Sequence, residues 1–249
     1  MNTAKKGVRL IAELCRKQGI RKVVFSPGSR SAPLVIAFTQ IPEIECLVIP
    51  DERVAGYFAL GMAQQLGEAV AVVCTSGTAV LNLSPAICEA YYQKIPLLIL
   101  TADRALGGFW KGDNQAIKLQ EKVFSSYTAL SLSVNGDTNS NYELNDITEK
   151  IEPVFLQMKR MSEPIHINVR MEEPLYLQEE TSAIQMPVTK IKDNYFGIIA
   201  ETENFKKQIA AAKRKLIVVG MHSADNNFQQ QVSLLAKRTD TTVWIEHLS

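Results

Sequence analysis

Four short segments of this chain carry polar or charged side chains directly after an apolar run. They are Ser26-Pro27-Gly28-Ser29-Arg30-Ser31, Asp51-Glu52-Arg53, Thr75-Ser76-Gly77-Thr78 and Thr101-Ala102-Asp103-Arg104. Each preceding run has the composition of a buried strand, and open parallel α/β sheets bind ligands beyond the carboxyl ends of their strands. The four segments are therefore the candidate binding residues.

Three of these segments contain an arginine. Arg30, Arg53 and Arg104 each follow a different strand. A guanidinium group binds carboxylates in a planar, bidentate manner, whereas a single arginine at a rim is usually a solvated charge. Three arginines in one crevice would indicate a substrate with several carboxylates. The sequence allows this convergence without requiring it.

Glu52 is the candidate acid or base. It follows a strand and opens a helix whose residues 54–58 are apolar or aromatic, apart from one glycine. One interpretation is a first-turn carboxylate that the helix dipole favours. The other is a carboxylate at the apolar root of a cleft, where loss of solvent favours the protonated form. Spacing alone does not decide between them.

The segment Thr75-Ser76-Gly77-Thr78 offers backbone N–H groups and hydroxyls at the start of a helix, which suits polar or anionic ligand atoms. It is neither G-x-G-x-x-G nor G-x-x-x-x-G-K-[ST], so it does not predict a mononucleotide site. An ordinary capped turn is the alternative, as it is for residues 27–31. The glycine-rich, aromatic loop 105–117 is either a lid or a long connection.

The elements that must position these residues alternate between apolar runs and helical patterns. Strands are expected at 22–26, 45–49, 68–75, 96–101, 126–134 and 164–169. Helices are expected at about 8–19, 31–41, 52–66, 78–93 and 146–161, with a polar loop at 135–145. This order predicts an α/β fold with a doubly wound, mostly parallel sheet.

The last third of the chain has a different pattern. Residues 171–195 lack periodicity and contain several glutamates and prolines. After them we expect a helix at 199–213, a strand at 215–220, a helix at 224–238 and a strand at 241–246. We therefore predict a first domain at 1–175, a linker at 176–195, and at 196–249 the truncated beginning of a second α/β domain.

Composition excludes several classes of protein. The chain has 249 residues, 46% of them hydrophobic, and a formal net charge of +1, which is typical of a soluble globular protein. No apolar run approaches the roughly 20 residues of a membrane helix, and the near-zero charge gives no electrostatic attraction for nucleic acid. The N-terminus is too polar for a signal peptide, so we expect a cytoplasmic protein.

The cysteines and histidines do not indicate a metal site. Cys15, Cys46, Cys74 and Cys88 form no C-x-x-C pair and lie in apolar stretches, so we interpret them as buried free thiols in a reducing compartment. His166, His222 and His247 have no metal-ligand spacing.

Taken together, five motifs resemble one family closely. They are S-P-G-S-R-S-A-P at 26–33, D-E-R-V-A-G-Y-F-A-L-G-M-A at 51–63, T-S-G-T-A at 75–79 with N-L-S-P-A at 82–86, L-T-A-D-R at 100–104 and N-Q-A-I at 114–117. The family is the thiamine-diphosphate-dependent 2-succinyl-5-enolpyruvyl-6-hydroxy-3-cyclohexene-1-carboxylate (SEPHCHC) synthases of menaquinone biosynthesis. The resemblance implies decarboxylation of 2-oxoglutarate and addition of the succinyl unit to isochorismate.

The resemblance also implies roles for particular residues. Glu52 matches the glutamate that hydrogen-bonds N1′ of the cofactor's aminopyrimidine and so activates it. Thr75, Ser76, Gly77 and Thr78 match the loop near the pyrimidine. The matches to substrate-side positions, which would bind carboxylates and hydroxyls, are Ser29, Arg30, Arg104, Asn114 and Gln115. Arg53 receives no role from the family.

The chain departs from the family in two respects. Ala105 follows A-D-R where the family usually has proline, so that loop is expected to be less rigid. The family is also about twice as long, and its further domain holds the diphosphate with Mg²⁺ or Mn²⁺ at the interface of a homodimer or homotetramer. This chain would then be an N-terminal fragment with half a cofactor site. The alternatives are another thiamine-diphosphate decarboxylase or ligase, and a non-catalytic α/β ligand-binding module.

Overall fold

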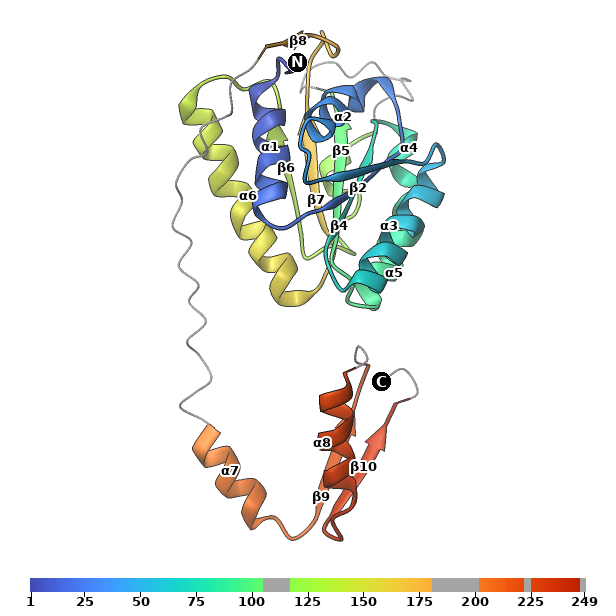
Figure 1. Cartoon of the computed structure of the whole chain (residues 1–249), viewed down its shortest axis with the longest axis vertical. Coiled ribbons are helices and arrows are strands. Elements are labelled where there is room, and N and C mark those ends of the chain that lie inside the picture. The colour runs from blue at the N-terminus through green and yellow to red at the C-terminus, as the bar shows by residue number, and fades with distance from the viewer. Residues whose placement is uncertain (105–116, 181–201, 222–224, 247–249) are drawn as a thin grey trace. The chain divides into compact units, whose positions relative to one another are not determined.

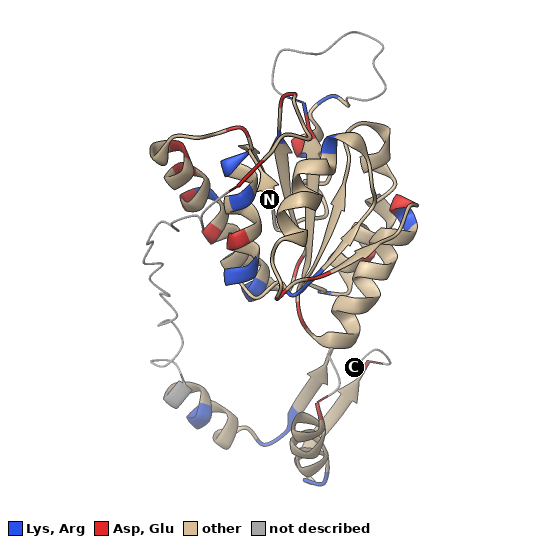
Figure 2. Cartoon of the chain, turned by 45° about the horizontal axis from the view of Figure 1, so that its top comes forward, with Lys and Arg blue, Asp and Glu red and all other residues tan. Residues whose placement is uncertain are grey.

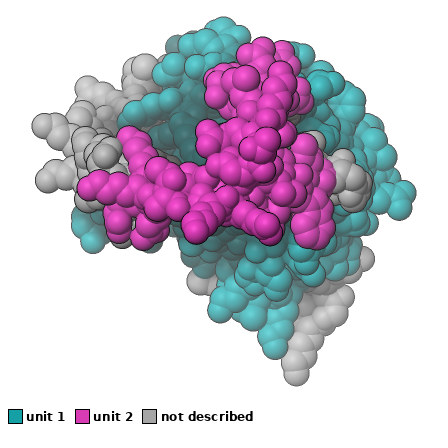
Figure 3. All heavy atoms as spheres, turned by 90° about the horizontal axis from the view of Figure 1, so that it is seen from below, with its two compact units in different colours: residues 1–191 teal, residues 192–249 magenta. Residues whose placement is uncertain are grey.

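The computed structural model describes residues 1–104, 117–180, 202–221 and 225–246. It divides the chain into two compact units, Met1–Ile191 and Lys192–Ser249, which Figure 3 colours separately. Asn114 and Gln115 lie outside the described residues, as does most of the loop 105–117.

The first unit is built on a six-stranded sheet whose neighbouring strands are all parallel (Figure 1). In spatial order the strands are β3 (Glu45–Val48), β2 (Lys22–Phe25), β4 (Val70–Cys74), β5 (Leu97–Asp103), β7 (Ile165–Arg170) and β6 (Leu130–Asn135). β4 and β5 are buried along their whole length because both faces of the sheet are covered. The predicted doubly wound α/β fold is confirmed.

Two layers of helices cover this sheet. One consists of α1 (Lys6–Lys17), α2 (Ala32–Thr39) and α6 (Asn141–Met161); the other consists of α3 (Glu52–Leu66), α4 (Thr78–Leu81) and α5 (Ser84–Tyr92). A separate hydrophobic core lies under each layer. The charged side chains are concentrated on α1 and α6, whereas the layer of α3 and α5 is largely uncharged (Figure 2).

Local sequence explains where the principal helices begin and end. At the start of α3, the Asp51 carboxylate accepts a hydrogen bond from the backbone N–H of Val54 at 2.9 Å, and Gly67 ends the helix with φ 67°. α6 begins at Asn141 rather than at the expected residue 146. The Glu143 N–H donates to Oγ of Ser140 at 3.3 Å, and that hydroxyl donates to the Glu143 carboxylate, so the polar stretch before 146 is helical.

Two further expectations are corrected. The single helix expected at 78–93 is two helices, because Pro85 has no N–H for the carbonyl four residues earlier. The strand expected at 126–134 begins only at Leu130 and lies at the sheet edge. Within the expected linker, β8 (Gln178–Glu179) pairs antiparallel with β1 (Asn2–Thr3). Two short 3₁₀ turns, Ser29–Ser31 and Gln120–Lys122, complete the unit.

The second unit contains α7 (Thr202–Ala211), β9 (Lys215–Val219), α8 (Asn226–Ala236) and β10 (Thr241–Ile245). The order helix, strand, helix, strand is the predicted one, and β9 pairs with β10 in parallel. Leu216, Val218 and Trp244 are 64%, 58% and 65% exposed, so this two-stranded sheet presents apolar surface. Among the described helices of the whole chain, none has the length and apolar character needed to span a membrane.

Candidate active site at the carboxyl end of the sheet

The direction in which successive strands are added to the sheet reverses between β2 and β4. After β2 the chain enters the α1–α2–α6 layer, and after β4 it enters the opposite layer. Such a switch point separates two loops at the carboxyl ends of neighbouring strands. At this point Gly28 approaches Thr75 so closely that a Cβ on Gly28 would lie 2.4 Å from the Cβ of Thr75. Only glycine fits at this position.

Arg30 is buried at this end of the sheet, with 7% of its surface exposed. Its Nη1 donates a hydrogen bond to the carbonyl of Met171 at 2.8 Å, and its Nη2 lies 3.3 Å from Oε1 of Glu173. Burial lowers the pKa of Arg30, and the positive charge of Arg104 lowers it further. Arg30 and Arg104 are therefore electrostatic neighbours, although they follow different strands.

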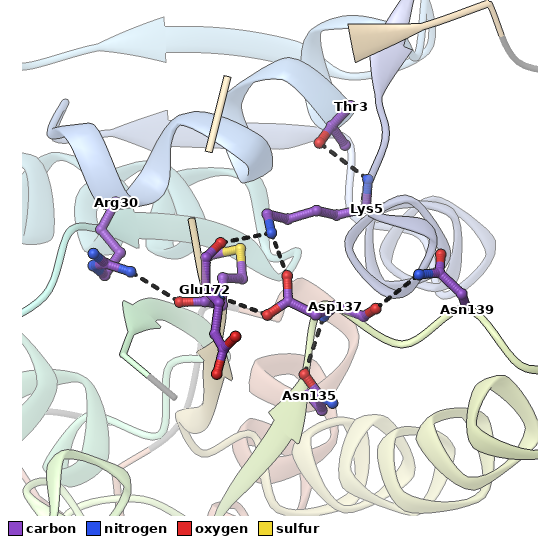
Figure 4. A network of polar contacts seen from close by, with 8 residues as sticks. Thr3, Lys5, Arg30, Asn135, Asp137, Asn139 and Glu172 are labelled. Carbon is purple, nitrogen blue, oxygen red and sulfur yellow. Dashed lines mark hydrogen bonds and ion pairs between the residues drawn. The ribbon is translucent and has the colours of Figure 1, made fainter. Parts of the chain in front are cut away.

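The backbone segment that accepts the Arg30 hydrogen bond is itself held in place (Figure 4). Asp137 accepts from the N–H of Glu172 at 2.6 Å through Oδ2, and it forms an ion pair with Lys5 through Oδ1. Lys5 Nζ also donates to the Glu172 carbonyl at 2.7 Å. Lys5 and Asp137 thus fix the segment after β7, and with it the Met171 carbonyl that orients Arg30.

Glu52 is the first residue of α3 and is half-buried. Asn82 donates from Nδ2 to Oε2 of Glu52 at 3.3 Å. The carboxylate also lies near the end of β4: burial raises the pKa of the Cys74 thiol to about 12, and the charge of Glu52 contributes to that shift. Glu52 is therefore partly covered by the described chain, and a dry pocket around its carboxylate stays a prediction.

The loop after β4 brings its four residues into different environments. Thr75 and Ser76 are half-buried, Gly77 is buried, and Thr78 is exposed at the first position of α4. Gly77 has φ 81° and ψ −148°, a conformation open essentially to glycine alone. Its N–H donates to Oε1 of the buried Gln120 at 3.1 Å.

The remaining predicted residues are less closely associated. Ser29 is exposed on the turn before α2. Arg53 is exposed on α3 beside Val54, Tyr57 and Phe58, so it does not join the other two arginines. The interpretation of the cysteines as buried holds for two of the four only: Cys46 and Cys88 are half-buried, because their elements lie at the surface of their layers.

Sequence reasoning missed a buried polar cluster between β5 and β7. His166 is fully buried, with Nε2 2.7 Å from Oγ1 of Thr101 and Nδ1 2.8 Å from Oγ of Ser131. Burial lowers the pKa of His166 to about 3. Asn168 follows two residues later and donates to the carboxylate of Asp103. Two polar residues spaced by two in an otherwise apolar strand point to the same face, which was the available signal.

Asp103 links this cluster to the candidate binding residues. It is 4% exposed, and burial raises the pKa of its carboxyl, while hydrogen bonds from Asn168 and from the N–H of Arg104 oppose that rise. Among the residues that the structure describes, no group of three or more His, Cys, Asp or Glu could hold a metal ion. The chemistry of the described site is therefore that of two guanidinium groups, a carboxylate, hydroxyls and backbone N–H groups.

Comparison with known proteins places the chain in a class. Residues 5–121 match the model of the N-terminal TPP binding domain of thiamine pyrophosphate enzymes. The fold is that of benzoylformate decarboxylase from Polynucleobacter necessarius, with a TM-score of 0.68 and 17% identity, covering 98% of this chain and 43% of that one. The chain therefore belongs to the thiamine pyrophosphate enzymes.

Within that class the chain belongs to the SEPHCHC synthase family, as its motifs predicted. It is 39% identical to the synthase of Flavobacterium johnsoniae over 248 residues, covering 96% of this chain and 44% of that protein. It is 40% identical to the synthase of Flavobacterium psychrophilum, covering 95% and 42%, and 35% identical to that of Porphyromonas gingivalis, covering 98% and 43%. The chain thus spans less than half the length of these relatives.

Proposed function

We propose that this chain forms the pyrimidine side of the active site in a thiamine-diphosphate-dependent synthase. The whole enzyme would decarboxylate 2-oxoglutarate and add the succinyl unit to isochorismate. One observation carries the proposal: Arg30, buried beneath the surface, is an electrostatic neighbour of Arg104 at the carboxyl end of the sheet. Both proposed substrates carry carboxylates, which guanidinium groups bind in a bidentate manner.

The residues at the switch point suit the pyrimidine half of the cofactor. Glu52 presents a half-buried carboxylate, and the close approach of Gly28 to Thr75 keeps the two neighbouring loops in contact. When bound, thiamine diphosphate supplies the group that stabilises the negative charge left by decarboxylation. Glu52 would share a proton with N1′ of the aminopyrimidine, and the 75–78 loop would contact the ring.

Substrate recognition is assigned to the arginines and their neighbours. Arg30 and Arg104 would bind carboxylates, with Ser29 supplying a hydroxyl at the entrance. Asn114 and Gln115 would also bind carboxylates or hydroxyls of the substrate. A decarboxylase or ligase with another substrate would leave both arginines facing solvent, and the burial of Arg30 argues against that alternative. The family of the chain argues against a non-catalytic binding module.

We also propose that the enzyme is cytoplasmic and works as a homodimer or homotetramer, and the exposed face of α3 supports the oligomer. Val54, Tyr57 and Phe58 are 49%, 45% and 48% exposed within two turns of Glu52. A second protein surface that covers these side chains would also exclude water from Glu52. That surface would bring the diphosphate site with its Mg²⁺ or Mn²⁺, for which the described residues offer no ligand cluster.

The test is an assay of the whole enzyme with 2-oxoglutarate and isochorismate, with and without thiamine diphosphate. Turnover should require both substrates and the cofactor. Glu52→Gln should lower kcat by about 10²- to 10⁴-fold without lowering Tm, since the amide keeps the shape but does not exchange the proton. Glu68→Gln, in an exposed position before β4, is the matched control and should behave as the unsubstituted enzyme. Full activity of Glu52→Gln would refute the assignment.

A further inference from the structure

Two buried amide side chains connect loops that the proposed function places on opposite sides of the reaction. Gln120 and Asn168 are 1% and 0% exposed. Gln120 comes from the 3₁₀ turn before β6, and Asn168 comes from the middle of β7. We name their hydrogen-bonded arrangement the Gln120–Asn168 bridge. Neither residue belongs to the motifs that indicated the family.

Every polar atom of the two amides has a partner. Gln120 donates from Nε2 to the carbonyl of Ala102 at 2.8 Å and to Oδ1 of Asn168 at 2.9 Å, and its Oε1 accepts from Gly77. Asn168 donates from Nδ2 to Asp103 at 2.8 Å and to Ser133 at 3.2 Å. A buried network that is fully satisfied in this way is rigid, and it specifies one arrangement of the segments it joins.

The two ends of the bridge reach the candidate site. At one end the Gly77 N–H is held by Gln120 at 3.1 Å, which fixes the 75–78 loop in the conformation that only glycine adopts. At the other end Asp103 accepts from Asn168 through Oδ2 and from the N–H of Arg104 through Oδ1, each at 2.8 Å. A continuous chain of hydrogen bonds therefore runs from the loop after β4 to the arginine after β5.

We propose that Gln120 and Asn168 are positioning residues that set the distance between the 75–78 loop and Arg104. The inference rests on the proposed function, in which that loop contacts the cofactor's pyrimidine and Arg104 binds substrate carboxylate. Neither amide touches the reacting atoms; each acts through the backbone that it holds. Loss of one amide would let the loop and the arginine move independently, although each would keep its own chemistry.

The first test measures the loop directly and needs no assumption about activity. In Gln120→Met, which keeps the length of the side chain but removes its donors and acceptor, amide hydrogen exchange at Gly77 should be about fivefold to tenfold faster. Exchange in the middle of β4, at Val72, should be unchanged. Thr148→Val is the matched control, because the buried Thr148 bonds only the carbonyl of Leu144 within α6. It should leave Gly77 as it is.

The second test uses steady-state kinetics of the whole enzyme. Gln120→Met and Asn168→Leu should each raise the KM for 2-oxoglutarate or isochorismate by about tenfold, through misplacement of groups that remain present. A purely structural role would lower Tm and the fraction of active enzyme while leaving KM unchanged, as Thr148→Val should. Unchanged exchange at Gly77 together with unchanged KM would overturn the inference.

The two proposals fail in different ways. If the unsubstituted enzyme shows no turnover with 2-oxoglutarate and isochorismate, the proposed function is wrong, and faster exchange at Gly77 in Gln120→Met would still support the bridge as the element that fixes the loop. If turnover is as proposed and Gln120→Met alters neither exchange nor KM, the function stands and the bridge is refuted.

Discussion

The buried histidine of the first unit should make the stability of the chain depend on pH in a specific way. His166 is fully buried between β5 and β6, and Phe124 packs edge-on against its ring with 5.1 Å between the ring centres. Burial lowers the pKa of His166 from 6.5 to about 3, so the folded chain keeps the imidazole neutral. The unfolded chain protonates the same group near pH 6.5.

The sign and size of the effect follow from this difference. Above pH 6.5 neither state binds the proton, and the stabilisation is fully present. Below pH 6.5 the unfolded state binds a proton that the folded state does not bind, so stability is lost as the pH falls toward about 3. Lowering the pH from 7.5 to 5.0 spans about 1.5 units of the window and should cost about 2 kcal/mol.

The measurement is urea unfolding of the chain at pH 7.5 and pH 5.0, compared with His166→Gln. The variant keeps polar atoms near Thr101 and Ser131 but does not titrate, while all other ionisable groups remain the same. The loss between the two pH values should therefore be about 2 kcal/mol greater for the unsubstituted chain, or about 4–8 °C in Tm. Equal losses in the two proteins, or a His166 ring signal that titrates near pH 6, would contradict the buried neutral imidazole.

Two further predictions concern the loops that carry the site. Gly28→Ala should destabilise the chain by roughly 1–3 kcal/mol, because the added Cβ would collide with Thr75. Gly61→Ala, with open space around it in α3, should stabilise the chain by up to about 1 kcal/mol. Equal effects in urea unfolding would show that the loops after β2 and β4 are not in contact. Asp137→Asn should lower the free energy of unfolding by about 1–3 kcal/mol, because it loosens the segment after β7. Asp146→Asn, in an exposed helical ion pair, is the control and should cost about 0–0.5 kcal/mol. Identical unfolding midpoints for the two variants would show that Asp137 does not hold that segment in place.

The sheet was largely predictable because the burial of its central strands is evident from their apolar sequences. Residues 70–74 and 97–100 are unbroken apolar runs, and such runs occur where both faces of a parallel sheet are covered. The edge strand was predicted less well. Ser131 and Ser133 alternate with apolar residues in β6, and nothing local marks residues 126–129 as lying outside it. Ser140 and Glu143 have the S-x-x-E spacing of a helix start, but the polar composition of the first turn of α6 favoured a loop there.

The site was predictable only as far as strand ends determine it. Arg30 and Arg104 both follow parallel strands, so they were expected at the same edge of the sheet. The burial of Arg30 depends on the Met171 carbonyl, 141 residues away, and no local pattern records that contact. The same holds for Gly77 and Gln120, which meet across 43 residues. The partial burial of Glu52 depends on what packs against the start of α3, which local periodicity does not determine.

The arrangement around Arg30 explains how a strongly cationic site can exist at the edge of an apolar sheet. Burial lowers the pKa of Arg30, and repulsion from the positive charge of Arg104 lowers it further. The Met171 carbonyl and the Glu173 carboxylate offset part of the cost of burial and repulsion. Glu173 is 74% exposed, so its carboxylate is held loosely and can be exchanged for another. A substrate carboxylate would thus enter a place where negative charge is already favoured, and the geometry of Arg30 would be fixed before it arrives.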